Sequence, residues 1–103
     1  MNITAVIGTR PEAIKMCPVI HALRKREGVR AALILSGQHK ELADGVLSEF
    51  SLSADADLSL MKKGQSALDT VRGVLAGLPP LLAKERPDLL LVHGDTSTAF
   101  AAA

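Results

Sequence analysis

Three short apolar runs are the feature that most constrains how this chain can fold. They occupy residues 3–7, 31–35 and 89–92, and none has the strict alternation of a strand with one face in water. Strands that are apolar on both sides are typical of parallel sheets covered by helices on both faces. Helical patterns separate the runs, over about residues 11–26, 40–50 and 66–86. This alternation predicts an open parallel α/β sheet.

The third helical segment supports more specific expectations. Its apolar residues recur at helical spacing, so we expect its core side to carry Leu68, Val71, Val74, Leu75, Leu78, Leu81 and Leu82. Pro79 and Pro80 should bend or split this helix, because proline lacks the N–H that a helix interior uses. Just before it, Leu58–Met61 is expected to form a short edge strand.

Composition and charge exclude several classes of function. A chain of 103 residues with 48% hydrophobic and 22% charged residues can build one globular core. Its net charge is +1 and its 12 Lys and Arg residues are spread out, which argues against a nucleic-acid surface. Met1–Thr4 does not begin a signal peptide, and no apolar run approaches the roughly 18 residues of a membrane span. We expect a soluble, cytoplasmic protein in which the single Cys17 forms no internal disulfide.

The end of the chain suggests that it is part of something longer. Residues 95–103 read as a helix cap followed by the first turn of an Ala-rich helix, where the chain stops. The last strand would then keep an unpaired edge, which favours self-association. We therefore expect residues 1–103 to be a fragment of a longer protein.

The segment Gly8–Met16 follows the first apolar run and predicts an anion site. Pro11 suits the first turn of a helix, and the free N–H groups of that turn attract negative charge. Arg10 stands at this helix start, and Lys15 lies one turn along from Pro11 on the same side of the helix. Together the two cations could hold a diphosphate, although each alone could also be a solvated surface charge.

The segment His93–Thr98 follows the last apolar run and supports two interpretations. Asp, Thr and Ser are all favoured at helix starts, so the segment could be a helix cap alone, with Gly94 allowing close approach. Alternatively, Asp95 could act as a general acid or base. Ligands of open parallel sheets bind at the carboxyl ends of strands, where both polar segments lie.

Other phosphate and metal motifs do not fit the sequence. Gly8 lacks the further glycines of a dinucleotide fingerprint, and no Gly-Lys-Ser/Thr ending marks a P-loop. His21, His39 and His93 are scattered, so no metal site is predicted.

The motifs together resemble the amino-terminal part of the non-hydrolysing UDP-N-acetylglucosamine 2-epimerases. The resemblance covers all 103 residues and rests on Gly8–Met16, Gly37–His39 and Val92–Thr98. It implies a GT-B arrangement of two Rossmann-like domains, commonly in a homodimer. Residues 1–103 would form part of the N-terminal domain, and the C-terminal nucleotide-binding domain would be absent.

The resemblance also implies a chemistry. The family removes UDP from UDP-N-acetylglucosamine by anti elimination, leaving a bound 2-acetamidoglucal, and adds UDP back with C2 inverted, which serves surface polysaccharide synthesis. It needs no metal and no NAD. Arg10 and Lys15 would stabilise the departing diphosphate, and Asp95 matches an essential carboxylate of the family. The family's other acid/base glutamates lie beyond Ala103, so the chain alone should be inactive.

A regulatory site and two alternatives complete these expectations. In members that their own substrate activates, a second substrate molecule binds near the motif that Gln38 and His39 match, helped by an arginine in a later loop. Here that loop reads Lys62–Gln65 and holds no arginine. The alternatives are a related or hydrolysing UDP-sugar epimerase, and a non-catalytic, self-associating domain.

Overall fold

A parallel sheet forms the centre of the molecule. The computed structural model describes residues 1–37, 40–60, 62 and 64–103. Its strands are β1 (Asn2–Ile7), β2 (Arg30–Leu35), β3 (Ala56–Asp57) and β4 (Leu89–Leu91). They lie in the order β3-β2-β1-β4, and every neighbouring pair is parallel. The predicted α/β class and the parallel sheet are thereby confirmed.

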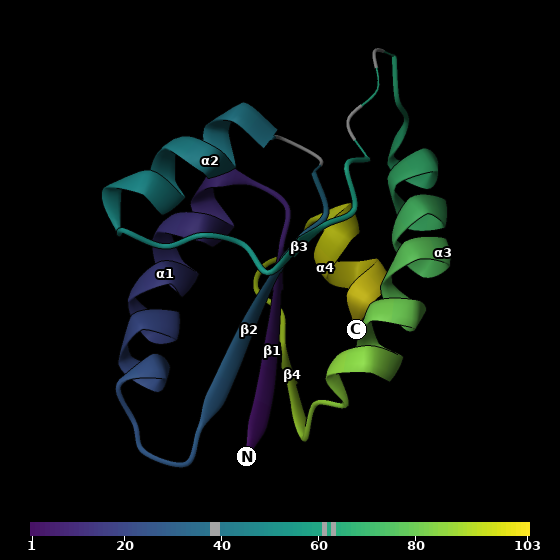
Figure 1. Ribbon diagram of the computed structural model, residues 1–103. Coiled ribbons are helices and arrows are strands. Elements are labelled where there is room, and N and C mark those ends of the chain that lie inside the picture. Colours follow the sequence, from purple (N-terminus) through teal and green to yellow (C-terminus); the bar gives the residue numbers. More distant parts are fainter. Residues whose placement is uncertain (38–39, 61, 63) are drawn as a thin grey trace.

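Helices cover both faces of this sheet, as strands without polar faces require. Helices α1 (Arg10–Arg24) and α2 (Lys40–Glu49) lie on one side, and α3 (Ala67–Glu85) and α4 (Ser97–Ala102) on the other (Figure 1). Successive strand residues alternate between the two sides. Ala5 and Leu33 pack with α1 and α2, whereas Val6 and Ile34 pack with α3 and α4. Each face of the sheet therefore has its own hydrophobic cluster.

Helix α1 begins at a capped start and continues through a proline. Thr9 is its N-cap in extended backbone, Pro11 stands in the first turn and Pro18 lies inside the helix. The helix ends at Arg24, two residues before the predicted end, and Gly28 then turns the chain with φ of 80°. A left-handed φ favours glycine because it carries no Cβ.

The expected edge strand over Leu58–Met61 is wrong in position. The strand is Ala56–Asp57, and Ser59 ends the extended conformation with φ of 54°. Leu58 and Leu60 instead pack against α3, where the side chain of Leu60 covers Gly73. Their alternating apolar pattern thus reflects helix contact rather than a longer strand; Met61 lies outside the described residues.

The predicted core side of α3 is only partly correct. Val74 and Leu78 are buried, but Leu68 is 68% and Leu75 58% exposed. At about 100° per residue, Leu75 lies about 100° around the helix from Val74. The apolar stripe is wider than the sheet face it meets, so its flank remains in solvent. Pro79 and Pro80 do not split α3, which is one helix from Ala67 to Glu85.

Among the described residues, no helix is both long enough and apolar enough to cross a membrane.

Candidate functional site

The carboxyl ends of three neighbouring strands meet at one edge of the sheet. The segments leaving β1, β2 and β4 all lie there, because these strands are parallel and adjacent. From β1 the chain passes to β2 on one side, and later returns to β4 on the other side. The carboxyl ends of β1 and β4 therefore flank the point where strand order reverses, which is where open α/β sheets bind ligands.

Gly8 permits the close packing of these three segments. A Cβ at this residue would lie 2.5 Å from Thr98 Oγ1 and 2.6 Å from Ser36 Oγ. Both hydroxyls are buried, and Thr98 Oγ1 donates to Ser36 Oγ at 2.9 Å. Gly94, expected to allow close approach, has nothing within 4 Å of such a Cβ. Its φ of 85° explains the glycine there, and the close approach occurs at Gly8 instead.

Glu12 joins the two polar segments that the sequence singles out. Its carboxylate is buried, and Oε1 accepts from Thr9 N at 3.0 Å, Thr9 Oγ1 at 2.9 Å and Gly8 N at 3.3 Å. The hydroxyl of Thr96, beyond β4, donates to the same carboxylate. Glu12 was not among the predicted site residues. The spacing Thr9-x-x-Glu12 is a capping-box signature, and this signal could have identified it.

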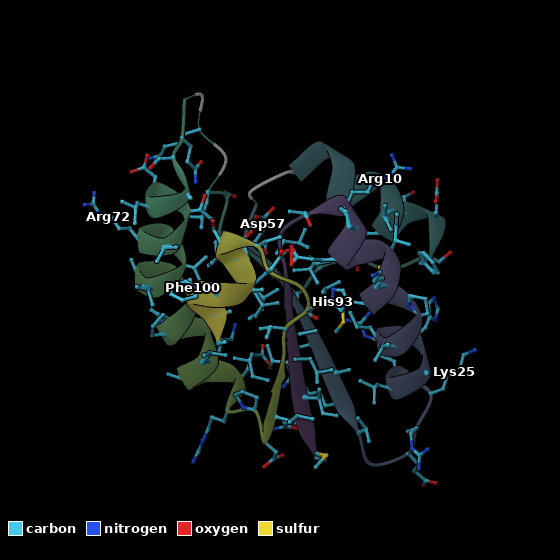
Figure 2. All side chains as sticks on the ribbon, turned by 180° about the vertical axis from the view of Figure 1, so that it is seen from behind. Arg10, Lys25, Asp57, Arg72, His93 and Phe100 are labelled. Atoms are coloured by element: carbon cyan, nitrogen blue, oxygen red, sulfur yellow. The ribbon has the colours of Figure 1, made fainter. Side chains whose placement is uncertain are left out.

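Arg10 and Lys15 both lie near the start of α1. Both are exposed on the first turns of α1, where helix N–H groups favour negative charge. Figure 2 shows Arg10 at the start of α1, at the end of the sheet where the strands finish. No ion pair holds either side chain within the described part of the chain. Both cations are therefore available to an anionic ligand.

Asp95 lies in the segment between β4 and α4 but does not cap the helix. The cap is Thr96, whose hydroxyl accepts from Ala99 N at 3.2 Å. Asp95 precedes this cap and is exposed. The interpretation of the segment as a cap thus holds for Thr96, and Asp95 is left facing solvent. His93, on the same segment (Figure 2), is half-buried.

The remaining predicted residues lie away from Arg10, Lys15 and Asp95 or outside the residues that the structure describes. Gln38 and His39 are outside the described residues. Lys62 and Gln65, from the loop expected near them, line a hollow of about 450 Å³ with Arg72 of α3. None of Arg10, Lys15 and Asp95 lines this hollow. Among the residues described, no group of three or more His, Cys, Asp or Glu side chains could hold a metal ion.

A Rossmann-like parallel sheet, with exposed cations near the start of α1 and an exposed carboxylate in the segment between β4 and α4, defines the class of the chain as an α/β protein. Residues 21–103 match the family model described as UDP-N-acetylglucosamine 2-epimerase. The chain belongs to the UDP-N-acetylglucosamine 2-epimerase family.

Named relatives support this assignment across nearly the whole chain. The UDP-N-acetylglucosamine 2-epimerase of Salmonella typhimurium is 46% identical over 98% of this chain, which covers 27% of the relative. The crystal structure of the Neisseria meningitidis UDP-GlcNAc 2-epimerase bound to UDP-GlcNAc has a TM-score of 0.93 at 45% identity. The match covers 99% of this chain and 28% of the Neisseria chain. The Methanocaldococcus jannaschii UDP-GlcNAc 2-epimerase, in complex with UDP-GlcNAc and UDP, has a TM-score of 0.89 at 30% identity and covers 99% and 28% of the two chains.

Proposed function

We propose that the complete protein containing this chain interconverts UDP-N-acetylglucosamine and UDP-N-acetylmannosamine. The observation that carries the proposal is the TM-score of 0.93, at 45% identity, to an epimerase bound to UDP-GlcNAc. The chain spans about 27% of the curated relatives it matches. Residues 1–103 therefore supply one part of the site, within the N-terminal domain of a two-domain GT-B protein. The C-terminal domain would bind the nucleotide.

Arg10 and Lys15 bind the diphosphate of the substrate. Negative charge develops on the diphosphate as the C1–O bond breaks, and cations placed beforehand stabilise that charge most. Their position on the first turns of α1 adds the partial positive charge of the helix start. The exposure of both side chains supports this role, since neither is used by a structural ion pair among the described residues.

Asp95 acts in proton transfer near C2 of the sugar. The forward step removes the C2 proton to a base and breaks the C1–O bond, so that UDP and a 2-acetamidoglucal remain bound. Return of a proton to the opposite face of C2, with UDP adding at C1, gives the manno epimer. Neither the elimination nor the addition moves a hydride, so the proposed steps use no NAD, and the proposal includes no metal.

Three further properties of the complete protein belong to the proposal. It forms a homodimer, acts in the cytoplasm and supplies precursors of surface polysaccharides. A second substrate molecule at Gln38 and His39 would regulate it. The hollow lined by Lys62, Gln65 and Arg72 places an arginine of α3 beside the loop that has none of its own.

The test is turnover of UDP-N-acetylglucosamine in deuterated water by the complete protein. We expect the manno epimer with deuterium at C2. Replacement Asp95→Asn should lower kcat by about 10²- to 10⁴-fold, the usual contribution of a positioned acid or base. The matched control is Asp88→Asn at the opposite end of β4, where the carboxylate accepts only from Asn2 N among the described residues, at 2.7 Å.

The products of this assay also distinguish the alternatives. Free N-acetylmannosamine with UDP would indicate a hydrolysing epimerase. Absence of epimer, glucal and free sugar would contradict the proposal and favour a non-catalytic domain. Equal loss of activity in the Asp95 and Asp88 variants would remove Asp95 from the proposed mechanism.

A further inference from the structure

The carboxylate of Glu12 receives more hydrogen bonds than a helix cap uses. A capping box needs one bond from the N-cap N–H to the carboxylate, and Thr9 N supplies it at 3.0 Å. Gly8 N and Thr9 Oγ1 donate to the same oxygen. The hydroxyl of Thr96 lies 3.2 Å from Oε1 and 3.3 Å from Oε2, although it is 84 residues away in sequence. Glu12 is only 2% exposed, so one buried group collects donors from two loops.

The direction of the bond between Thr96 and Glu12 follows from chemistry. The Thr96 hydroxyl accepts from Ala99 N at 3.2 Å, and it has a single proton to donate. A carboxylate accepts only, so this proton points to Glu12. The hydroxyl thereby links the start of α4 to the start of α1.

The link lies beyond the region where the strands themselves hold the loops together. The last pair of the β1–β4 ladder is Ala5 with Leu91, and both chains leave the sheet soon afterwards. Asp95 directly precedes Thr96, and Arg10 directly follows Thr9, which also donates to Glu12. Their relative position therefore depends on this buried contact as well as on the sheet.

We propose that Glu12 is a positioning residue, which holds the loop of Arg10 against the loop of Asp95 through the hydroxyl of Thr96. The inference rests on the proposed function, because it assigns a common task to those two side chains. Glu12 is buried and acts through these contacts rather than on the substrate. Placement matters because a shift of about 1 Å in a reacting group can lower a rate about 10²-fold.

The experiment compares two helix caps in the complete protein. Thr96→Val removes a cap hydroxyl together with the bond to Glu12, while Ser66→Ala removes only the cap hydroxyl of α3, which accepts from Asp69 N. We expect Thr96→Val to lower kcat about 10- to 100-fold and to change KM less than about threefold. Ser66→Ala should leave kcat unchanged. Thr96→Ser, which keeps the hydroxyl, should retain kcat within about threefold of the original protein.

A double variant and hydrogen exchange test the link itself. Glu12→Gln replaces one acceptor oxygen with a donor group, and its combination with Thr96→Val should lose no more kcat than the larger single loss. The amides of Gly8 and Thr9 should exchange faster in Thr96→Val but not in Ser66→Ala, since only the first change disturbs their acceptor.

The outcomes separate this inference from the proposed function. An active original protein whose Thr96→Val variant keeps full kcat would overturn the positioning role alone. So would an equal loss of kcat in Ser66→Ala, which would assign the effect to capping. An original protein that does not convert UDP-N-acetylglucosamine would overturn the proposed function, and the positioning role with it.

Discussion

Helices α1 and α3 begin with the same local device on opposite sides of the sheet, yet the two devices do different work. Each has a hydroxyl at the N-cap and a carboxylate three residues later. Asp69 is exposed and accepts from Ser66 N at 3.0 Å, a bond within its own turn. Glu12 is buried and accepts from a second loop through Thr96. Burial thus converts a local cap into a long-range contact.

The same contrast extends to the packing of the two sides. Among the described residues, the cluster beneath α1 and α2 includes fully buried Cys17 and Ile20. The cluster beneath α3 and α4 relies more on partly buried residues, and leaves Leu68, Leu75 and Phe100 largely exposed. We infer that buried contacts hold α1 against the sheet more firmly than α3.

Removal of the two carboxylates should give the largest difference between the helices. Glu12→Ala leaves several buried donors without their acceptor, and we expect it to lower the free energy of unfolding by about 3–4 kcal/mol. Asp69→Ala removes an exposed acceptor that water can replace, so its effect should be much smaller. Urea denaturation of both variants measures the difference. Equal losses would show that Glu12, too, is only a local cap.

Added methyl groups at two glycines test how firmly each side is packed. In Gly8→Ala the new Cβ would meet Thr98 Oγ1 and Ser36 Oγ, both on buried residues, and we expect a loss of about 1–3 kcal/mol. In Gly73→Ala of α3 it would lie equally close, 2.6 Å, to the end of the Leu60 side chain.

The outcome at Gly73 depends on whether its neighbour can move. Leu60 is half-buried and its end is flexible, and alanine favours the helix by about 1 kcal/mol over glycine. We therefore expect Gly73→Ala to change the free energy of unfolding by less than about 0.5 kcal/mol in either direction. A loss as large as that of Gly8→Ala would show that the α3 side is packed as rigidly as the α1 side.

Local patterns were enough to predict the sheet and the start of α1. The apolar runs at 3–7, 31–35 and 89–92 could be recognised because strands buried on both faces need no polar positions. The helix start near Arg10 and Lys15 followed from Pro11, which prefers the first turn of a helix. These inferences use neighbours in sequence, and the structure agrees with them.

What depended on partners distant in sequence could not be predicted. The spacing of Glu12 from Thr9 shows a cap, but nothing in it shows that Thr96 completes the contact. Leu75 and buried Leu78 belong to the same apolar pattern along α3. Only the width of the sheet face decides that Leu75 remains exposed. The sequence predicts Leu58 in a strand, because packing on α3 favours an apolar residue there as a strand would.

Exposed leucines on α3 should matter for association rather than for stability. Leu68→Ser and Leu75→Ser replace side chains that already face water, so each should change the free energy of unfolding by less than about 0.5 kcal/mol. If the proposed homodimer uses this flank, both variants should weaken self-association in sedimentation experiments. Ile14→Ser, at an exposed position of α1, is the control. A stability loss near that of a core change would contradict the exposure of this flank.

The smallest expected effect is the pH dependence of the exposed cap. Hydrogen bonds from the backbone and side chain of Ser66 lower the pKa of Asp69 below its ordinary value of 3.8. The ionised form is therefore favoured by folding, and its contribution to stability is present above pH 3.8 and lost as pH falls through the lowered pKa. The melting temperature of the original protein should exceed that of Asp69→Asn at neutral pH, and this difference should shrink in acid. In Ser66→Ala only part of this difference in melting temperature should be lost, because the bond from the backbone N–H of residue 66 to Asp69 remains. A difference that stays constant across this range would mean that the cap of α3 does not depend on charge.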